Sequence, residues 1–491
     1  MDTKTLLFLL ASAVLLPVGC AWVRGAPWRK DVCVFLLVLG TVHAGFIDIN
    51  VLSREWYRGT TRGLEWCWLD YLWVFVLVDE LRLRRAGARL AAPMCLSAMV
   101  LFIGYNALRV VTADPWIFGL FELSKMLRAF LLFLALAWYV KSERHLRLIV
   151  AALALATSYE FAATLYSRVI QGHARADGTL NHPNSLAMYN LMTVPVLFAV
   201  SLSSAPRALR RLCGVATLLG TLSVVMTISR AGFVGILLLL LGVGVTCGFW
   251  KSLGRVVATA VLLLVLGTVL YVKLGAAFNS RFETSLAAEY GDKPTEGRIV
   301  YLNLADLIIS ERPWGCGLNN WSWCVTNRYG PLLGMRYLPY ESTEVSPRRW
   351  PIPAGSKIEA AQAAPAHSLY AITLGESGWL GVVLLVLLWW SWLRLGASFL
   401  RARSPAFGSR FGTGAFFALV GVVLQSQVEW EIRQTPLLFL LHILLGALAG
   451  LYPARPSRLA ALARARARMP ARLTSPVRAV PNPPLAVDDL S

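Results

Sequence analysis

Charged residues are scarce in this sequence, and acidic residues are scarcer than basic ones. Asp, Glu, Lys and Arg make up 15% of its 491 residues, whereas soluble domains contain about 25%. Hydrophobic residues make up 57%, and uncharged apolar runs of about 20 residues, long enough to cross a bilayer as helices, recur along most of the chain. This composition excludes a cytosolic enzyme, a secreted disulfide scaffold, a coiled coil and a disordered chain. It indicates a protein with many membrane-spanning helices.

Several catalytic and cofactor-binding motifs are missing as well. The sequence has no Walker motif, so it is not by itself an ATP-driven pump. It has no Asp-x-Asp pair to hold a metal-bound nucleotide sugar and no Gly-x-Ser-x-Gly elbow of a serine hydrolase. Its cysteines form no Cys-x-x-Cys or His/Cys metal spacing, so we predict neither a metal nor a cofactor. Cys316 and Cys324 lie in a polar segment, where a disulfide and two free thiols are both open.

The apolar runs predict an all-α fold, a polytopic transmembrane helix bundle of about 12–13 spans. The first run is too long for a signal peptide and lacks a small-residue cleavage site, so it is interpreted as a retained helix. The candidate spans are 4–22, 32–50, 67–82, 90–112, 117–140, 147–170, 185–204, 212–228, 231–249, 256–273, 367–393, 411–427 and 435–452.

The net charge of +20 is explained by membrane topology, and no nucleic-acid partner is predicted. Basic residues cluster in alternate connections, which the positive-inside rule assigns to the cytoplasm. These residues are Arg24, Arg29, Lys30, Arg82, Arg84, Arg85, Arg89, Lys141, Arg144, Arg147, Arg207, Arg210, Arg211, Lys251, Arg255, Arg394, Arg401, Arg403 and Arg410. The intervening short connections carry only Arg54, Arg58, Arg62, Arg175, Arg230 and Arg433.

Four regions follow from this pattern. Residues 1–273 hold the N-terminal spans, and 367–452 hold the C-terminal spans. Between them, 274–366 forms a large outer loop with most of the polar content, and it is predicted to contain short helices and the site of chemistry. Residues 453–491 form a basic cytoplasmic tail, predicted to be mostly disordered and to lie on anionic membrane lipid.

Three residues combine a charged or reactive side chain with an unusual position. Arg298 starts a segment with helical apolar spacing. The helix dipole disfavours a cation at an N-terminus, and an anion bound there would explain its presence. A solvated loop arginine is the alternative. Arg230 lies in a short outer turn, where it faces a cavity or partner or extends to the interface. His367 stands where the polar loop meets a span, and imidazole suits a general base near neutral pH. A hydrogen bond to a helix end is its alternative role.

Three polar residues near the outer ends are candidate substrate contacts. Asn184 stands at the start of a span, where it or Ser185 would also suit helix capping. Asn319 and Trp321 belong to a Gly-rich turn, and both residue types often contact sugars, although Trp is also an ordinary membrane anchor.

Carboxylates inside predicted spans need partners. Glu376 lies within the span that begins at His367, and we include it among the candidate substrate contacts. Glu122 and Lys125 stand three residues apart near the outer end of another span, so they are predicted to pair on one helix face.

Four motifs resemble the O-antigen ligase / O-antigen polymerase family. They are Thr-Ile-Ser-Arg-Ala-Gly (227–232), Gly-Arg-Ile-Val-Tyr (297–301), Arg-Pro-Trp-Gly-Cys-Gly-Leu-Asn-Asn-Trp (312–321) and His-Ser-Leu-Tyr…Gly-Glu-Ser-Gly-Trp-Leu-Gly (367–381). Each motif is short, and the order, the spacing and the large loop before the histidine make the set specific. The resemblance covers roughly residues 170–450. Family members are multi-pass glycosyltransferases of the bacterial inner membrane with a large periplasmic loop.

The resemblance implies a glycan donor linked to undecaprenyl pyrophosphate, and it implies no ATP or metal. The two family arginines and the histidine that face the periplasm correspond to Arg230, Arg298 and His367. The arginines would bind the pyrophosphate and stabilise its developing charge, and the histidine would take the proton of the acceptor hydroxyl. In-line attack opposite the leaving group would invert the anomeric carbon. Ser368 stands where family members often have Asn, so no role follows for a neighbouring amide.

These motifs do not identify the acceptor. The favoured interpretation is a ligase that attaches O-antigen to lipid A-core. A polymerase of O-antigen or exopolysaccharide would join lipid-linked repeat units, and a related enzyme would glycosylate a protein hydroxyl. A flippase or transporter of lipid-linked sugars is the alternative of another class, although we find no convincing internal repeat. A structural scaffold would not need arginines on the side poor in basic residues.

Overall fold

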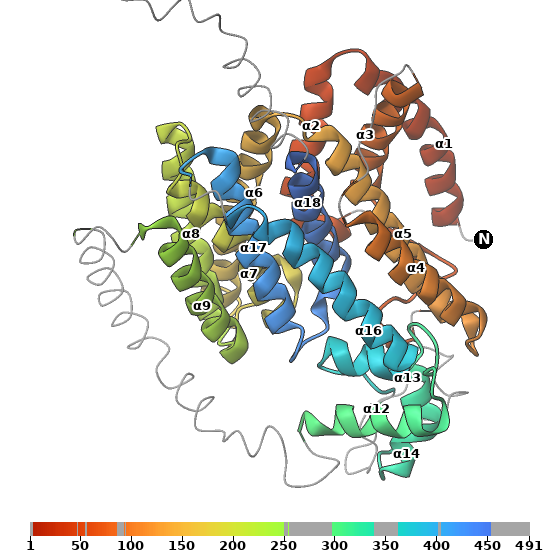
Figure 1. Ribbon diagram of the computed structural model, residues 1–491. Coiled ribbons are helices and arrows are strands. Elements are labelled where there is room, and N and C mark those ends of the chain that lie inside the picture. Colours follow the sequence, from red (N-terminus) through yellow and green to blue (C-terminus); the bar gives the residue numbers. More distant parts are fainter. Residues whose placement is uncertain are drawn as a thin grey trace, which may run out of the picture. The chain divides into compact units, whose positions relative to one another are not determined.

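Twelve of the thirteen predicted spans lie wholly or mostly on residues that the computed structural model describes, and helices occupy all or part of each. The described residues are 3–46, 48–54, 56–85, 93, 95–249, 254, 297–337, 362–400 and 404–452. They belong to one compact unit that ends at Tyr452 (Figure 1). The predicted span 256–273, the tail 453–491 and the loop segments 274–296 and 338–361 lie outside the described residues, as do Arg89, Lys251, Arg255, Arg401 and Arg403.

The described elements are helices with one short β-hairpin. The helices are α1 (Thr3–Arg24), α2 (Pro27–Leu39), α3 (Trp68–Arg85), α4 (Leu96–Val111), α5 (Trp116–Tyr139), α6 (Glu143–Val169), α7 (Pro183–Ser201), α8 (Arg207–Met226), α9 (Arg230–Cys247), α12 (Ile299–Glu311), α13 (Trp321–Cys324), α14 (Gly330–Leu332), α16 (Leu369–Ala397), α17 (Phe407–Gln425) and α18 (Thr435–Leu451). Short 3₁₀ turns η1 (Gly40–Phe46), η2 (Gly178–Leu180) and η6 (Glu431–Arg433) and the π-helical η4 (Val325–Tyr329) connect them. Strands β1 (Asp48–Val51) and β2 (Leu64–Cys67) pair antiparallel, with Asp48 opposite Cys67.

The length and apolarity of the helices confirm an all-α, multi-pass membrane protein. Seven described helices are long and apolar enough to cross a membrane, namely α1, α6, α7, α8, α9, α16 and α17. The shorter helices α4 and α18 are also apolar.

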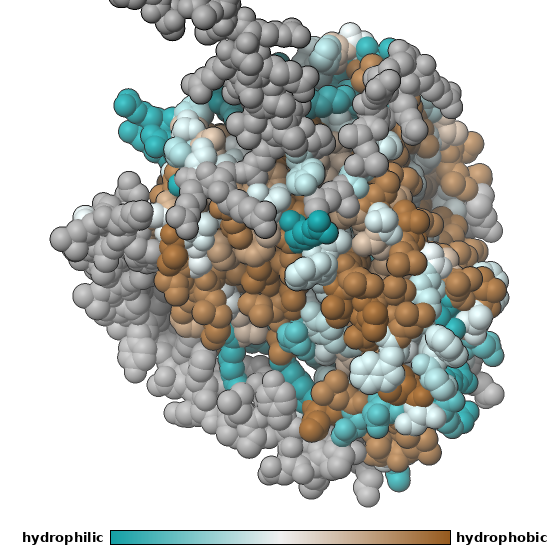
Figure 2. Space-filling model, in the orientation of Figure 1, coloured by the Kyte–Doolittle hydropathy of each residue, from teal (hydrophilic) through white to brown (hydrophobic). Residues whose placement is uncertain are grey.

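Burial differs strongly between helices and follows their position in the bundle. In the most apolar 18-residue stretch of α7, 83% of the residues are buried, because this helix packs against α8, α9 and α17 (Figure 1). A helix that is hydrophobic all round belongs in the interior. By contrast, α16 exposes Val383, Val386 and Trp390 on one side. Figure 2 shows such hydrophobic side chains gathered across the middle of the face drawn, as expected of a surface in contact with lipid.

One predicted helix boundary is wrong. The apolar run 32–50 was expected to form a single span, but α2 ends at Leu39 and the chain continues through η1 into β1. The residues of β1 alternate polar and apolar, which is the period of a strand. Pairing with β2 satisfies their backbone groups, so the hairpin replaces the last turns of the expected helix.

The described part of the predicted outer loop is helical and packs on the bundle. The segment with helical apolar spacing that Arg298 starts is confirmed as the helix α12, with Arg298 at its N-cap position, and α12 packs against α16. A small core joins these segments, and its buried members include Leu304, Ile308 and Ile372. Cys316 and Cys324 are both buried in this region as free thiols.

Candidate functional site

The start of α16 is anchored around His367. Ser368 is the N-cap residue of α16, and its hydroxyl accepts a hydrogen bond from the backbone N–H of Ala371 at 3.3 Å. The N–H of Leu369 donates to the carbonyl oxygens of Ser426 and Glu429, which lie between α17 and α18, at 3.0 and 3.2 Å. The serine found where the resembling family often has asparagine therefore caps the helix that carries His367.

The carboxylate of Glu429 joins three of the predicted site residues. Its Oε2 accepts a hydrogen bond from His367 Nδ1 at 2.8 Å. Its Oε1 accepts from Asn184 Nδ2 at 2.5 Å and from Arg298 Nη2 at 3.3 Å. The Glu429 side chain is only 2% exposed, and a buried carboxylate needs such a set of donors. The structure thus brings His367, Arg298 and Asn184 together on a residue that the sequence analysis did not select.

Glu429 also determines which nitrogen of His367 is basic. Burial alone would raise the pKa of Glu429, but the hydrogen bonds from His367 and Glu431 and the charge of Arg298 outweigh burial and lower the pKa. An ionised carboxylate can only accept hydrogen bonds, so Nδ1 of His367 carries the proton. Neutral His367 then has its lone pair on Nε2, in a side chain that is 36% exposed. This is the tautomer that a general base requires.

Asn184 has a different role from the helix cap that we predicted. The N-cap residue of α7 is His182, so that prediction is wrong. Asn184 Oδ1 instead accepts a hydrogen bond from Arg175 Nη2 at 2.9 Å, and Arg175 Nε donates to the carbonyl of Thr227 at 3.0 Å. This chain of bonds connects the turn before α9 with Glu429.

Arg230 lies beside that turn, as the first residue of α9. Ser229 caps α9 by accepting a hydrogen bond from the N–H of Gly232 at 3.4 Å. Thr227, which holds Arg175, precedes Arg230 by three residues. Of the three predicted catalytic residues, His367 and Arg298 therefore share a direct partner, and Arg230 is connected to them through the turn that Arg175 binds.

Two more titratable side chains border this cluster. Glu431 is 1% exposed, and its Oε1 lies 3.4 Å from His182 Nδ1. Burial, and then the charge of Glu429, raise the pKa of Glu431 well above its usual value, so Glu431 keeps its proton and shares it with Glu429. Burial lowers the pKa of His182, which favours its neutral form.

The same cluster has the composition of a small metal site. Ligand atoms of His367, Glu429 and Glu431 lie within 4.8 Å of one another, and nitrogen and carboxylate ligands suit several divalent ions. However, the oxygens of Glu429 already accept hydrogen bonds from Arg298 and from the N–H of His367, and a cation would have to displace these donors. A proton held within the cluster accounts for the paired carboxylates without an ion.

The other predicted substrate contacts lie in a separate, buried cluster. Asn319, Trp321 and Glu376 are 1%, 2% and 1% exposed. Glu376 accepts hydrogen bonds from Arg433 Nη1 at 2.8 Å and from the backbone N–H of Trp321 at 3.4 Å. Asn319 Nδ2 donates to two backbone carbonyls at 2.8 and 2.9 Å. These contacts hold the outer segment on the bundle, and a role in substrate binding stays a prediction.

The predicted pair of Glu122 and Lys125 is confirmed at 2.9 Å, with both side chains buried. Glu122 also accepts hydrogen bonds from the hydroxyls of Thr60, at 2.8 Å, and Thr61. Arg433 lies near enough to Glu122 to interact electrostatically. This second cluster is therefore an internal network of alternating charges.

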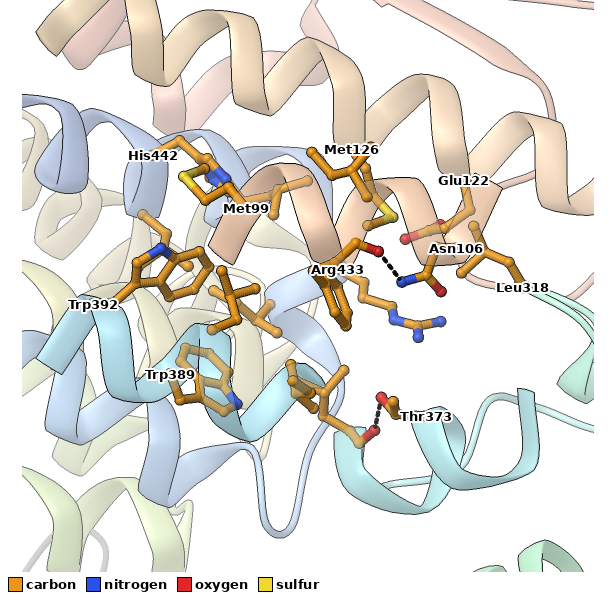
Figure 3. A pocket seen from close by; sticks show the side chains of 18 residues that line it. Met99, Asn106, Glu122, Met126, Leu318, Thr373, Trp389, Trp392, Arg433 and His442 are labelled. Atoms are coloured by element: carbon orange, nitrogen blue, oxygen red, sulfur yellow. Dashed lines mark hydrogen bonds between the residues drawn. The ribbon is translucent and has the colours of Figure 1, made fainter. Parts of the chain in front are cut away.

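Two cavities adjoin the clusters. The first encloses about 780 Å³ with its opening and lies among α4, α5, α16 and α18, lined mostly by apolar side chains. Figure 3 shows Trp389 and Trp392 toward one end of it and Glu122 and Arg433 toward the other. The second, polar cavity encloses about 1190 Å³ with its opening. Its lining residues are Val42, His43, Ala44, Gly45, Asn50, Thr60, Thr61, Arg62, Glu65, Lys125, Thr179, Leu180, Asn181, Gln434, Thr435 and Pro436.

Sequence reasoning missed Arg175, Glu429 and Glu431. The argument that selected Arg230, a charge on the side poor in basic residues, applies equally to Arg175 and would have found it. The two glutamates stand just before the last span, where a carboxylate needs a partner, and that signal was also present.

No family model matches this chain, and no curated protein matches it either. The likeness to the O-antigen ligase / O-antigen polymerase family therefore rests on the four sequence motifs. The activity has to be argued from the chemistry of the cluster around His367.

Proposed function

We propose that this protein is a metal-independent glycosyltransferase of the bacterial inner membrane. It moves a glycan from undecaprenyl pyrophosphate to an acceptor hydroxyl on the periplasmic side, in the manner of an O-antigen ligase that acts on lipid A-core. The observation that carries the proposal is the Glu429–His367 pair with Arg298 on the same carboxylate.

The pair supplies a base, and the arginines supply charge for a phosphate leaving group. Glu429 holds the Nδ1 proton of His367, so Nε2 takes the proton of the acceptor hydroxyl as its oxygen attacks the anomeric carbon. The new C–O bond forms as the bond from that carbon to the pyrophosphate oxygen breaks, and the electron pair leaves with the pyrophosphate. Arg298, Arg175 and Arg230 would bring guanidinium charge to the phosphate oxygens, which bind such groups through charge-assisted hydrogen bonds. Attack opposite the leaving group inverts the anomeric carbon.

The apolar cavity, with a volume of about 90 Å³, fits a short stretch of the donor's hydrocarbon chain. Leu369, two residues after His367, lines this cavity, and so do Ile432 and Arg433, which follow Glu431. A hydrocarbon between α16 and α18 would bury apolar surface there at about 25 cal/mol per Å². The reacting pyrophosphate of the same molecule would then lie near the outer ends of these helices.

The test is the size distribution of products made by purified protein in lipid. The substrates are an undecaprenyl-pyrophosphate oligosaccharide and a lipid A-core acceptor. We expect a single upward shift of the acceptor. In His367→Ala the rate at which the shifted product forms should fall by about 10²–10⁴-fold, the usual contribution of a general base. Binding of the donor should persist.

His145→Ala is the matched control. His145 lies in the first turn of α6, whereas Arg175 of the proposed site follows the other end of that helix, so this substitution should leave the product unchanged. A ladder of lengthening glycans without the acceptor would replace the ligase with a polymerase. Movement of the lipid-linked glycan across the bilayer with no new glycosidic bond would refute a transferase and indicate a flippase.

A further inference from the structure

The polar cavity is built from five separate segments of the chain. It lies between η1, the β1–β2 hairpin with its loop, α5, η2 and the start of α18. Its cavity volume is about 480 Å³, and pockets for drug-sized ligands measure about 300–1,000 Å³. The cavity therefore has room for a ligand with several rings.

Its lining has the hydrogen-bonding groups that bind carbohydrate. The lining includes three side-chain amides, those of Asn50, Asn181 and Gln434, and four hydroxyls, those of Thr60, Thr61, Thr179 and Thr435. Most of them already bond to the chain, as Thr179 does to Glu160 at 2.6 Å. Within the described residues, the side chains of Asn50 and Asn181 make no hydrogen bond, so their donors and acceptors are available to a ligand.

The charges on the lining favour an acidic ligand. Lys125 is paired with Glu122 at 2.9 Å, and Glu65 is paired with Arg128 at 3.1 Å. Arg62 is exposed and has no ion-pair partner in the part of the chain that the structure describes. A guanidinium with free donors binds phosphate or carboxylate, with two parallel hydrogen bonds.

One short segment connects this cavity with the site of chemistry. Glu431 belongs to the His367 cluster, Ile432 and Arg433 line the apolar cavity, and residues 434–436 line the polar cavity. Gln434 donates its N–H to the carbonyl of Glu431 at 2.8 Å and accepts a hydrogen bond from Ser185 at 2.8 Å. The three sites thus follow one another along six residues.

We propose that the polar cavity binds the acidic oligosaccharide of the acceptor, with Arg62 on its phosphate or carboxylate and Asn50 and Asn181 on its hydroxyls. This assignment rests on the proposed function and deepens it. The hydrocarbon of the donor and the sugar of the acceptor occupy different cavities, and the segment 431–436 borders both.

Three variants test the assignment. Gly45 lines the cavity and a Cβ on it meets nothing within 4 Å, so Gly45→Phe adds a ring at the cavity wall without a backbone clash. Asn181 has a φ of 57°, so Asn181→Gly removes the amide and keeps a conformation that glycine adopts freely. Arg62→Gln removes the charge. Gly104→Phe is the matched control, because Gly104 on α4 is also open at Cβ and does not line the cavity.

The measurement is calorimetric binding of phosphorylated core oligosaccharide, freed from its lipid, to the full chain in nanodiscs of neutral lipid. We expect Gly45→Phe to weaken binding by about tenfold or more and Gly104→Phe to leave it unchanged. Asn181→Gly should weaken it by a smaller factor. Arg62→Gln should weaken binding of the phosphorylated form by about tenfold and spare the dephosphorylated form.

Equal binding by wild type and Gly45→Phe would overturn the assignment, and so would the absence of any binding. Binding that anionic phosphatidylglycerol in the nanodisc abolishes would assign the cavity to a lipid headgroup instead. None of these measurements requires turnover, so the cavity can fail while transferase activity persists. Conversely, binding with the expected variant pattern would stand even if the glycosyl transfer were refuted.

Discussion

Glu429 and Glu431 stand on either side of Trp430, yet they hold opposite protonation states. The hydrogen bonds and charges around Glu429 outweigh burial and lower its pKa, whereas burial and the charge of Glu429 raise the pKa of Glu431. Ionising two neighbouring buried carboxylates together is unfavourable, because their negative charges repel, so one proton is shared between them. The ionised member is the one that orients His367.

This difference predicts how stability depends on pH. The raised pKa means that folded Glu431 binds its proton more tightly than the unfolded chain does, so its contribution is complete below its ordinary value near 4.5. That contribution is lost as the pH rises through the raised pKa. Glu431→Gln keeps a neutral polar group at every pH, so its midpoint of thermal unfolding should fall less than that of the wild type on going from about pH 5 to about pH 9.

Thermal unfolding in detergent across this pH range measures the effect. Glu311→Gln is the control, since the hydrogen bond from Arg328 lowers the pKa of the exposed Glu311, away from this pH range, and the substitution should leave the slope of the wild type intact. Glu429 acts with the opposite sign, because its stabilisation is present above its ordinary pKa and lost as the pH falls through the lowered one. Parallel curves for Glu431→Gln and the wild type would show that Glu431 is ionised in the folded protein.

At the scale of elements, the kink in α16 explains why two of the sequence motifs occur together. Gly378 has φ 65° and ψ −171° and interrupts the helix. The carbonyls of Gly375 and Glu376 instead accept hydrogen bonds from the N–H groups of Cys316 and Gly317, both at 2.8 Å. The outer segment thus satisfies backbone groups at the kink, and part of the motif similarity is structural rather than catalytic.

Gly378→Ala should therefore destabilise the protein. This combination of φ and ψ is essentially confined to glycine and costs other residues about 1–3 kcal/mol. A Cβ there would also lie 2.4 Å from the carbonyl oxygen of Pro313. The free energy of unfolding should fall by at least that amount, measured by denaturation in mixed micelles. Gly104→Ala, at an exposed helical position with open space at Cβ, should be neutral or stabilising by up to about 1 kcal/mol. Equal effects of the two substitutions would contradict the role of the kink.

Much of the element order could be predicted from the sequence, because lipid imposes a minimum length and apolarity on each span. The boundary after Leu39 could not, since an apolar run that ends in β1 differs from a helix only in its period. The prediction that Asn184 caps α7 was wrong for a related reason. A polar residue at a helix start satisfies capping rules locally, and its bond to Glu429, 245 positions away, depends on the packing of α7 against the α17–α18 connection.

At the scale of the whole molecule, the cluster around His367 combines residues from four distant parts of the chain. The sequence motifs identified His367 and Arg298, but Glu429 lies 62 residues from the histidine and 131 from the arginine. A single sequence shows which charges need partners, and it does not show which partners they have. The pairing follows from how α7, α12, α16 and the α17–α18 connection meet.

The charge distribution along the helices predicts which end of the bundle faces the cytoplasm. The more basic end carries ion pairs, including the largely buried pair of Lys30 with Asp79 at 2.5 Å and the pair of the exposed Arg144 with Asp31 at 2.7 Å. These pairs do not cancel the orientation signal, because that signal depends on Lys and Arg near helix ends and hardly on Asp and Glu. The end with His367 should therefore face the periplasm.

Labelling of introduced cysteines decides this orientation. Ala174, in the connection between α6 and α7, and Ala208, in the first turn of α8, are both exposed and lie at opposite ends of α7. In a background without Cys20 and Cys247, the two thiols that are not fully buried, Ala174→Cys should react with a membrane-impermeant maleimide in intact spheroplasts. Ala208→Cys should react only after lysis. The reverse pattern would place His367 in the cytoplasm, where it would not meet a donor displayed on the periplasmic face, and would refute the proposed transfer at its substrate.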